Sequence, residues 1–338
     1  MNKHYWTWPI AFYLFLGGLG GGMLFLAGVF DILYSTGNLG AVQLGAIDSF
    51  GSILAPGVFV GIVALGIGTA LLVFELGQPK VFLRVFLSAT AIIKWGAIML
   101  TIAMFAALIY FTFYLTPILP KGFVLPWQDW LWLRDGARGS MLVFGLGIML
   151  YTGILLSSLK SKPFWNTPAL PVLFTVSALS TASALLAATA GLVLTPEFMA
   201  GAAGQLYGEA LTEFMVEQLH FIDSVLVLAE LVVLLTYTLL MLGAGNVVAK
   251  NVALGWIKGS NAPLFWGGMI VCGLLLPFLF YQIGGMMATV IAPILVLAAG
   301  LLLRFMVIFA DDRRSVPGEE RYYSRLPKGD EGFLSAWK

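Results

Sequence analysis

Long apolar stretches alternate with short polar connections along almost the whole chain. About 20 predominantly apolar residues are needed to cross the hydrocarbon layer of a bilayer as a helix. Eight stretches reach that length: residues 9–33, 52–76, 90–115, 139–159, 169–194, 217–242, 263–282 and 286–309. Pro56, Pro277 and Pro293 fall inside them, and transmembrane helices tolerate proline as a kink. The pattern predicts an all-α, polytopic membrane protein with eight transmembrane helices.

The connections between the stretches suggest how the helices group. Short connections on the side that carries the termini suit two four-helix bundles, which we expect at residues 1–165 and 166–310. No low-complexity linker separates the two groups, and we find no internal repeat. Residues 311–338 are polar and are expected to form a tail outside the membrane.

The composition excludes several classes of function. Of the 338 residues, 60% are hydrophobic and 10% are charged, whereas a soluble domain carries about 25% charged residues. A net charge of +1 without a basic cluster argues against nucleic-acid binding. Cys272 is the only cysteine, and His4 and His220 are the only histidines. We therefore expect no iron–sulfur cluster, no metal site and no haem held by this chain alone.

Positive charges lie almost entirely on one side of the predicted membrane segments. Of the 18 Lys and Arg residues, only Lys121, Arg134 and Arg138 fall in connections opposite the termini. Cytoplasmic connections carry an excess of Lys and Arg, so the count places both termini in the cytoplasm. An acidic partner docked on the same face would produce the same asymmetry.

Five glycines crowd the first predicted helix. They are Gly17, Gly18, Gly20, Gly21 and Gly22. Small residues four positions apart let helix backbones approach closely, and close packing is the simpler interpretation. The alternative is that the missing side chains open a slot for a flat ring. A phosphate loop is excluded, because no strand precedes the glycines and no Lys-Ser or Lys-Thr follows them.

Three tryptophans lie within six residues between the third and fourth stretches. Trp127, Trp130 and Trp132 are typical of an anchor at the membrane–water interface, either a belt or a short amphipathic helix. A groove for a quinone or a lipid is the alternative interpretation.

The sixth stretch carries a row of ionisable residues whose spacings keep them on one helical face. The row consists of Glu213, Glu217, His220, Asp223 and Glu230. A charge inside the hydrocarbon costs at least about 2.5 kcal/mol, so Asp223 and Glu230 are expected to face the bundle interior. Two interpretations stay open: a proton or ion path, and a structural pair with Arg304 or Lys94.

Two tyrosines lie about a turn inside the terminal-side boundary of their stretches. At that depth the phenols of Tyr13 and Tyr151 can each donate a hydrogen bond while their rings pack on apolar surface. An aromatic belt is the structural alternative. No Ser–His–Asp order, HExxH or Walker pattern supports hydrolytic or nucleotide chemistry.

Several strings, in order along the chain, are similar to those of one known family. They are WPIAFYLFLGGLGGG (8–22), ELGQP (75–79), KWGAIML (94–100), YTGILLSSLKSKPFWNTPALPVLFTVSALSTASAL (151–185) and AAGLLLRFMVIFA (298–310). On these strings the chain resembles the NrfD/polysulfide reductase membrane-subunit family.

The resemblance implies an eight-helix subunit that exchanges electrons between the quinone pool, with menaquinone expected, and a docked partner of a respiratory oxidoreductase. The implied partners are a four-cluster ferredoxin-like iron–sulfur subunit and a molybdopterin or tungstopterin catalytic subunit. The implied location is the cytoplasmic membrane of a prokaryote. Several relatives place their catalytic subunits outside the cytoplasm, which disagrees with the side that the charge count favours.

The resemblance also selects site residues. Tyr151 matches the tyrosine of the family's Tyr-Thr-Gly element, and Tyr13 stands where polysulfide reductase carries a quinone-contacting histidine. Glu75 replaces a family aspartate and is a candidate for proton exchange or partner docking. Trp8 and Lys94 complete the candidate quinone-binding set, with Lys94 stabilising the reduced, anionic ring.

Quinone chemistry also needs a route for protons. The candidate residues are Glu217, His220, Asp223, Glu230 and Arg304, with Arg304 holding the Glu230 carboxylate. The same intramembrane carboxylates and Gly/Pro-interrupted helices suit a secondary transporter of a small solute or ion. A purely structural anchor is the third possibility, and quinone binding would distinguish the redox subunit from both rivals.

Overall fold

A computed structural model describes residues 8–35, 47–75, 92–115, 125–159, 162–192 and 204–310. Eight helices in these ranges are long and apolar enough to cross a bilayer, which confirms the predicted all-α membrane architecture. Helices are the expected form because the hydrocarbon offers no hydrogen-bond partner to the backbone. The predicted tail at 311–338 lies outside the described residues.

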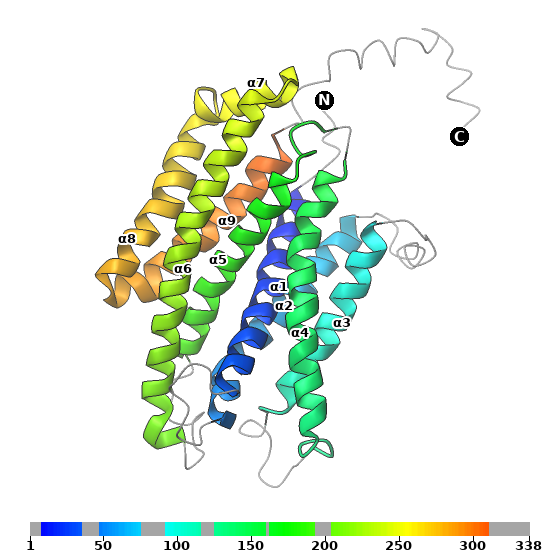
Figure 1. Cartoon of the computed structure of the whole chain (residues 1–338), viewed down its shortest axis with the longest axis vertical. Coiled ribbons are helices and arrows are strands. Elements are labelled where there is room, and N and C mark those ends of the chain that lie inside the picture. The colour runs from blue at the N-terminus through cyan, green and yellow to red at the C-terminus, as the bar shows by residue number, and fades with distance from the viewer. Residues whose placement is uncertain are drawn as a thin grey trace, which may run out of the picture.

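The first five spans are single helices that follow the predicted stretches. They are α1 (Trp8–Ser35), α2 (Ile47–Glu75), α3 (Ile92–Thr112), α4 (Leu131–Ser157) and α5 (Ala169–Leu192). The sixth span is the long α6 (Gly204–Gly243), and a short helix, α7 (Val247–Ile257), follows it. Figure 1 shows α7 at the same end of the bundle as the start of α1.

The last two spans are composite. The seventh joins the π-helix η2 (Leu264–Leu275) to α8 (Leu276–Ile283), and the eighth joins η3 (Met287–Ile291) to α9 (Ala292–Ile308). Each π-helical segment ends shortly before a proline, Pro277 or Pro293. Proline lacks the N–H that would bond the carbonyl one turn earlier, so the regular α pattern is interrupted there. Two of the three prolines expected to kink a helix thus follow π-helical segments, whereas Pro56 lies within the uninterrupted helix α2.

Helix α1 lies at the centre of the bundle and contacts α2, α4, α5 and α9. Its glycines make these approaches possible. A Cβ atom at Gly20, Gly21 or Gly22 would lie 2.8, 3.0 or 2.8 Å from a carbonyl oxygen of α2, α4 or α5, respectively. The contacts support the close-packing interpretation. The division into two bundles stays a prediction, and α1 contacts helices of both predicted groups.

Two helices, α4 and α6, begin eight or more residues earlier than the apolar pattern predicts. Helix α4 begins at Leu131 rather than at residue 139, and its first turns carry paired charges. The Arg138 guanidinium lies 3.4 Å from the Asp31 carboxylate of α1 and 3.1 Å from Asp135. Pairing makes charge tolerable near the bilayer edge, so the helix continues through a segment that a hydropathy window rejects. Helix α6 likewise begins before the predicted stretch, at Gly204, and this added part contains Glu209 and Glu213.

The tryptophan cluster lies at the start of α4. The Trp127 indole donates a hydrogen bond to the Thr112 hydroxyl over 3.0 Å. Trp130 and Trp132 are exposed and stack with their ring centroids 5.9 Å apart. An exposed aromatic pair at a helix end fits the interfacial belt better than a ligand groove.

Candidate functional site

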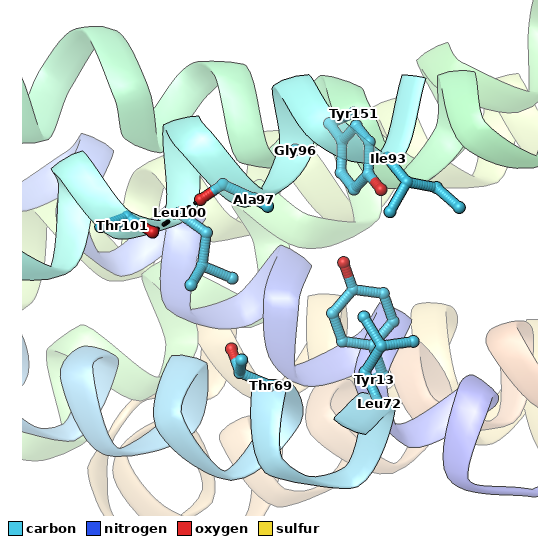
Figure 2. A pocket seen from close by; sticks show the side chains of 9 residues that line it. All are labelled: Tyr13, Thr69, Leu72, Ile93, Gly96, Ala97, Leu100, Thr101 and Tyr151. Atoms are coloured by element: carbon cyan, nitrogen blue, oxygen red, sulfur yellow. Dashed lines mark hydrogen bonds between the residues drawn. The ribbon is translucent and has the colours of Figure 1, made fainter. Parts of the chain in front are cut away.

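The two predicted tyrosines meet in one pocket. Tyr13 lies in the second turn of α1 and Tyr151 lies near the end of α4, so both are at the end of the bundle where α1 begins. Each is 5% exposed, and the two side chains are close enough to interact electrostatically. Figure 2 shows the two phenol oxygens directed toward one another across the pocket.

Four helices line this pocket, which encloses about 70 Å³. The lining residues are Tyr13, Thr69, Leu72, Ile93, Gly96, Ala97, Leu100, Thr101 and Tyr151. The Thr69 and Thr101 hydroxyls donate to carbonyl groups of their own helices over 2.7 and 2.8 Å. The two phenols are therefore the hydrogen-bond donors that the pocket offers to a ligand.

Gly96 of α3 determines where the Tyr151 ring lies. A Cβ atom at this position would collide with three atoms of the ring, so the ring rests directly on the α3 backbone. The KWG string marks the position in the sequence, but only the fold shows which side chain fills the space. Gly96 is thus a site residue that the sequence analysis missed.

Two other predicted members of this site, Trp8 and Lys94, do not line the pocket. Trp8 is 56% exposed and meets Phe12 edge to face at 5.7 Å, and Phe12 in turn meets Phe305 of α9. Lys94 lies at the start of α3, two residues before Gly96, and does not line the pocket. Glu75 is the last residue of α2, and its side chain lies outside the described part of the structure.

The acidic row of α6 lies at a second hollow, a cleft of about 510 Å³ between α6 and the turn that joins α8 to η3. Glu213, Glu217 and His220 line this cleft together with Tyr281. Gly284 and Gly285 form the turn with φ angles of 76° and 63°, a conformation that glycine adopts without strain. The lining residues of α6, from Glu213 to Ser224, lie in the first half of this helix. Figure 1 shows that the other end of α6 meets α7 at the end of the bundle where α1 begins. The cleft is therefore nearer the opposite end of α6 from the tyrosine pocket.

Tyr281 connects the cleft to a buried carboxylate. Its hydroxyl donates to Asp223 over 2.5 Å, and its ring centroid lies 5.2 Å from that of His220. Asp223 is fully buried and also accepts a 2.8 Å hydrogen bond from Ser180 of α5. Neither Tyr281 nor Ser180 was selected from the sequence, because no pattern signals which hydroxyl will face a carboxylate from another helix.

Glu230 and Arg304 interact electrostatically, and Ser177 contacts both of them. The Arg304 guanidinium donates to the Ser177 hydroxyl over 2.5 Å, and that hydroxyl also interacts with the Glu230 carboxylate. Arg304 is fully buried and donates further hydrogen bonds to the carbonyl groups of Gly300 and Phe174, over 3.0 and 3.1 Å. Ser177 thus bridges two buried charges.

The polar row extends from the cleft into the bundle interior. Asp223 and Glu230 are seven residues apart on α6, which is about two turns, and the two carboxylates interact electrostatically. At its inner end, the Arg304 guanidinium carbon lies 4.9 Å from the centroid of the Phe174 ring and 6.0 Å from that of Phe15 on α1. The structure therefore places Glu217, His220, Asp223, Glu230 and Arg304 in one row, with about two turns of α6 between Asp223 and Glu230.

Comparison with known proteins identifies the relatives of this protein. The family described as polysulphide reductase, NrfD, matches residues 1–312. The sequence is 29% identical to the C subunit of polysulfide reductase from Wolinella succinogenes, over 91% of its own length and 95% of that protein. It is 30% identical to the protein NrfD of Escherichia coli, over 90% of its own length and 94% of that protein. The chain is therefore a multi-pass membrane protein that belongs to the NrfD/polysulphide reductase family.

Proposed function

We propose that this chain is the quinone-reactive membrane subunit of a respiratory oxidoreductase. Membership of the family supports its role as a membrane anchor within a redox complex. The observation that carries quinone reactivity is the pair of buried phenols, Tyr13 and Tyr151, in a largely apolar pocket.

The pocket suits a quinone because it combines two requirements. A quinone head group is a flat apolar ring with carbonyl oxygens, so it needs hydrogen-bond donors within a largely apolar surround. Tyr13 and Tyr151 supply the donors, while Leu72, Ile93 and Leu100 supply the apolar walls. As substrate, the quinone takes up two electrons and two protons to become the quinol. The phenols would orient its carbonyl group and hold a proton at the oxygen, in a space with little room for water.

The position of the pocket indicates where the electron-transfer partner docks. The pocket lies at the end of the bundle where α1 begins, so the partner's nearest redox centre approaches from that end. We propose a four-cluster iron–sulfur subunit there, with a molybdopterin or tungstopterin catalytic subunit beyond it, and menaquinone as the quinone. The lysine and arginine excess on this side supports a cytoplasmic face of a prokaryotic inner membrane.

The test is quinol-dependent electron transfer in the complex purified from native membranes. Tyr151→Phe and Tyr13→Phe each remove one donor and leave the ring in place. One hydrogen bond contributes about 1 kcal/mol, so turnover and the affinity for a quinone-site inhibitor should each fall roughly fivefold. Tyr114→Phe, a buried tyrosine near the far end of α3, is the matched control. Unchanged turnover and inhibitor affinity in Tyr151→Phe would show that the site is elsewhere.

We further propose that the row from Glu217 to Arg304 conducts protons. The supporting observations are the cleft that exposes Glu217 and His220, the Tyr281–Asp223 hydrogen bond behind it, and the bridge from Glu230 to Arg304. Carboxylates and hydroxyls in such an order are the groups that proton relays in membrane proteins use.

Asp223→Asn tests the proton route, because an amide cannot carry the exchangeable acidic proton. In proteoliposomes that hold the complex, this variant should slow proton uptake during quinol turnover, followed with an enclosed pH dye, by about tenfold or more. A matched Thr236→Val variant on the exposed face of α6 should leave the rate unchanged. Uptake of a solute by the isolated protein, without quinone binding, would instead support the transporter.

A further inference from the structure

A further hollow lies where α3 ends and α4 begins. Helix α3 starts beside the tyrosine pocket and runs away from it, so this hollow is at the opposite end of the two helices. It encloses about 360 Å³, a volume within the range of about 300–1,000 Å³ that small-molecule sites occupy. This α3–α4 cleft is lined by Phe113, Tyr114, Gln128, Asp129, Leu131 and Arg134.

Hydrogen bonds between the two helix ends give the cleft its shape. The side-chain amide of Gln128 donates to the carbonyl group of Phe113 over 2.7 Å, and the Trp127 indole donates to the Thr112 hydroxyl over 3.0 Å. Within the turn that precedes α4, the backbone N–H of Trp130 donates to the carbonyl of Trp127 over 3.0 Å. The turn is thereby tied to α3, with a charged residue of the cleft on each side of the point where α4 begins.

One part of the cleft suits a phosphate group. Arg134 lies in the first turn of α4, and a guanidinium presents a planar pair of N–H donors that matches phosphate oxygens. The positive end of the α4 dipole is at the same place. The first turn contains no acidic residue, and the preceding Trp130 makes no side-chain hydrogen bond to the helix end.

The neighbouring charges favour a ligand that also carries a positive group. Asp129 lines the cleft beside Arg134. The Arg134 Nε atom lies 3.7 Å from Asp135, and Arg138 pairs with both Asp135 and Asp31. Among the described residues, this group therefore holds two guanidiniums and three carboxylates. A purely anionic ligand would meet a net negative surround, whereas a zwitterion would place its phosphate at Arg134 and its ammonium at Asp129.

The surface beside the cleft is that of a membrane interface. Leu131 lines the cleft and is exposed, and the exposed rings of Trp130 and Trp132 stack next to it in the sequence. Tryptophans of this kind lie at the level of the lipid head groups. The tryptophan pair acts as the anchor, and the cleft beside it offers polar contacts at the same level. A phospholipid therefore fits this position better than a soluble zwitterion, which would leave the apolar rim uncovered.

We propose that the α3–α4 cleft binds the head group of a phosphatidylethanolamine molecule. Its phosphate contacts Arg134 and the first turn of α4, its ammonium group contacts Asp129, and its acyl chains begin at Leu131 and the tryptophan pair. This inference does not depend on the proposed quinone reactivity, because the two sites lie at opposite ends of α3.

The experiment compares three phospholipids with identical acyl chains: phosphatidylethanolamine, phosphatidylglycerol and phosphatidylcholine. Each is titrated into the delipidated, detergent-purified complex, and bound lipid is counted by native mass spectrometry. Arg134→Gln removes the phosphate contact, Arg134→Lys keeps its charge, and Asp129→Asn removes the ammonium contact. The matched controls are Lys250→Gln and Glu213→Gln, which remove one charge each at exposed positions away from the cleft.

The wild-type complex should bind phosphatidylethanolamine about tenfold more tightly than the other two lipids, because one charged hydrogen bond distinguishes them. Asp129→Asn should abolish this preference and leave the affinity for phosphatidylglycerol unchanged. Arg134→Gln should weaken all three lipids about tenfold, Arg134→Lys should recover part of that loss, and both controls should behave as wild type.

Three results would overturn the proposal. Tighter binding of phosphatidylglycerol than of phosphatidylethanolamine would show that the cleft takes an anionic lipid. A preference that survives Asp129→Asn would show that the ammonium group binds elsewhere. Wild-type affinities for all three lipids in Arg134→Gln would show that the cleft holds no lipid phosphate. Because the preference is a ratio of affinities within one variant, a general loss of stability does not imitate it.

Discussion

Gly96→Ala tests how the tyrosine pocket is built. The added Cβ atom would occupy space that the Tyr151 ring now fills, and three atoms of that ring lie too close for any ordinary contact. Tyr151 is 5% exposed, and its ring packs directly on the α3 backbone at Gly96. The ring therefore cannot move into solvent. The substitution must therefore move the phenol, or α3, or both.

The structure allows the size of the effect to be estimated. Inserting a methyl group into a well-packed interior typically costs about 1–3 kcal/mol. Displacing the phenol removes one hydrogen bond to a bound quinone, which is about 1 kcal/mol, or roughly fivefold in the dissociation constant. We expect Gly96→Ala to lower the unfolding temperature of the purified protein and to weaken quinone binding together. Thermal unfolding in detergent and calorimetric titration measure the two effects.

Two comparisons separate the ring contact from other consequences of the substitution. Gly66→Ala on α2 is the control, because its Cβ atom would meet only Met104, at 3.9 Å, and alanine is the better helix former. In a Tyr151→Ala background the ring is gone, so Gly96→Ala should cost little stability there, and the two changes should be strongly non-additive. If Gly96→Ala leaves both stability and quinone affinity at wild-type values, the described packing of Tyr151 on α3 is wrong.

The remaining predictions concern the framework. Arg138→Gln removes the guanidinium that lies 3.4 Å from the buried Asp31 carboxylate of α1 and should cost roughly 3 kcal/mol of stability. Asp31→Asn should restore much of that loss in the double variant, and thermal unfolding measures both effects. Gly22→Val should separate α1 from α5, because a Cβ atom at this position already lies 2.8 Å from an α5 carbonyl oxygen; the expected cost is about 1–3 kcal/mol, and wild-type stability would refute the contact. Ser177→Ala removes the bridge between two buried charges and should destabilise the protein by about 1–3 kcal/mol, whereas Ser158→Ala at an exposed position should not.

The sequence predicts the eight spans well because hydropathy over a bilayer-sized window depends on composition alone. The prediction fails where a helical segment depends on contacts or backbone hydrogen bonds that composition does not report. The start of α4 contains Arg134, Asp135 and Arg138, and only the partner on α1, Asp31, explains why a helix persists there. The π-helical segments before Pro277 and Pro293 likewise depend on backbone hydrogen bonding, which hydropathy does not report.

The candidate site was predictable in part for a similar reason. Tyr13 and Tyr151 are separated by more than a hundred positions, and their depth in two helices together with the family resemblance selects them. The sequence analysis missed Gly96 and Tyr281, because their roles depend on which helices are neighbours. Polar groups that act through a third residue, as Arg304 does through Ser177, become visible only after the helices are assembled.

The central claim is that a quinone binds between Tyr13 and Tyr151, and covalent labelling tests it most directly. An azido-quinone would be activated by light in native membranes, and the labelled peptides of this protein would be identified by mass spectrometry. We predict label on α3 and α4 around Gly96 and Tyr151, with competition by excess natural quinone. The account would be contradicted if the label were found only at the α6 cleft around His220, with none near the two tyrosines, and if excess natural quinone prevented this labelling.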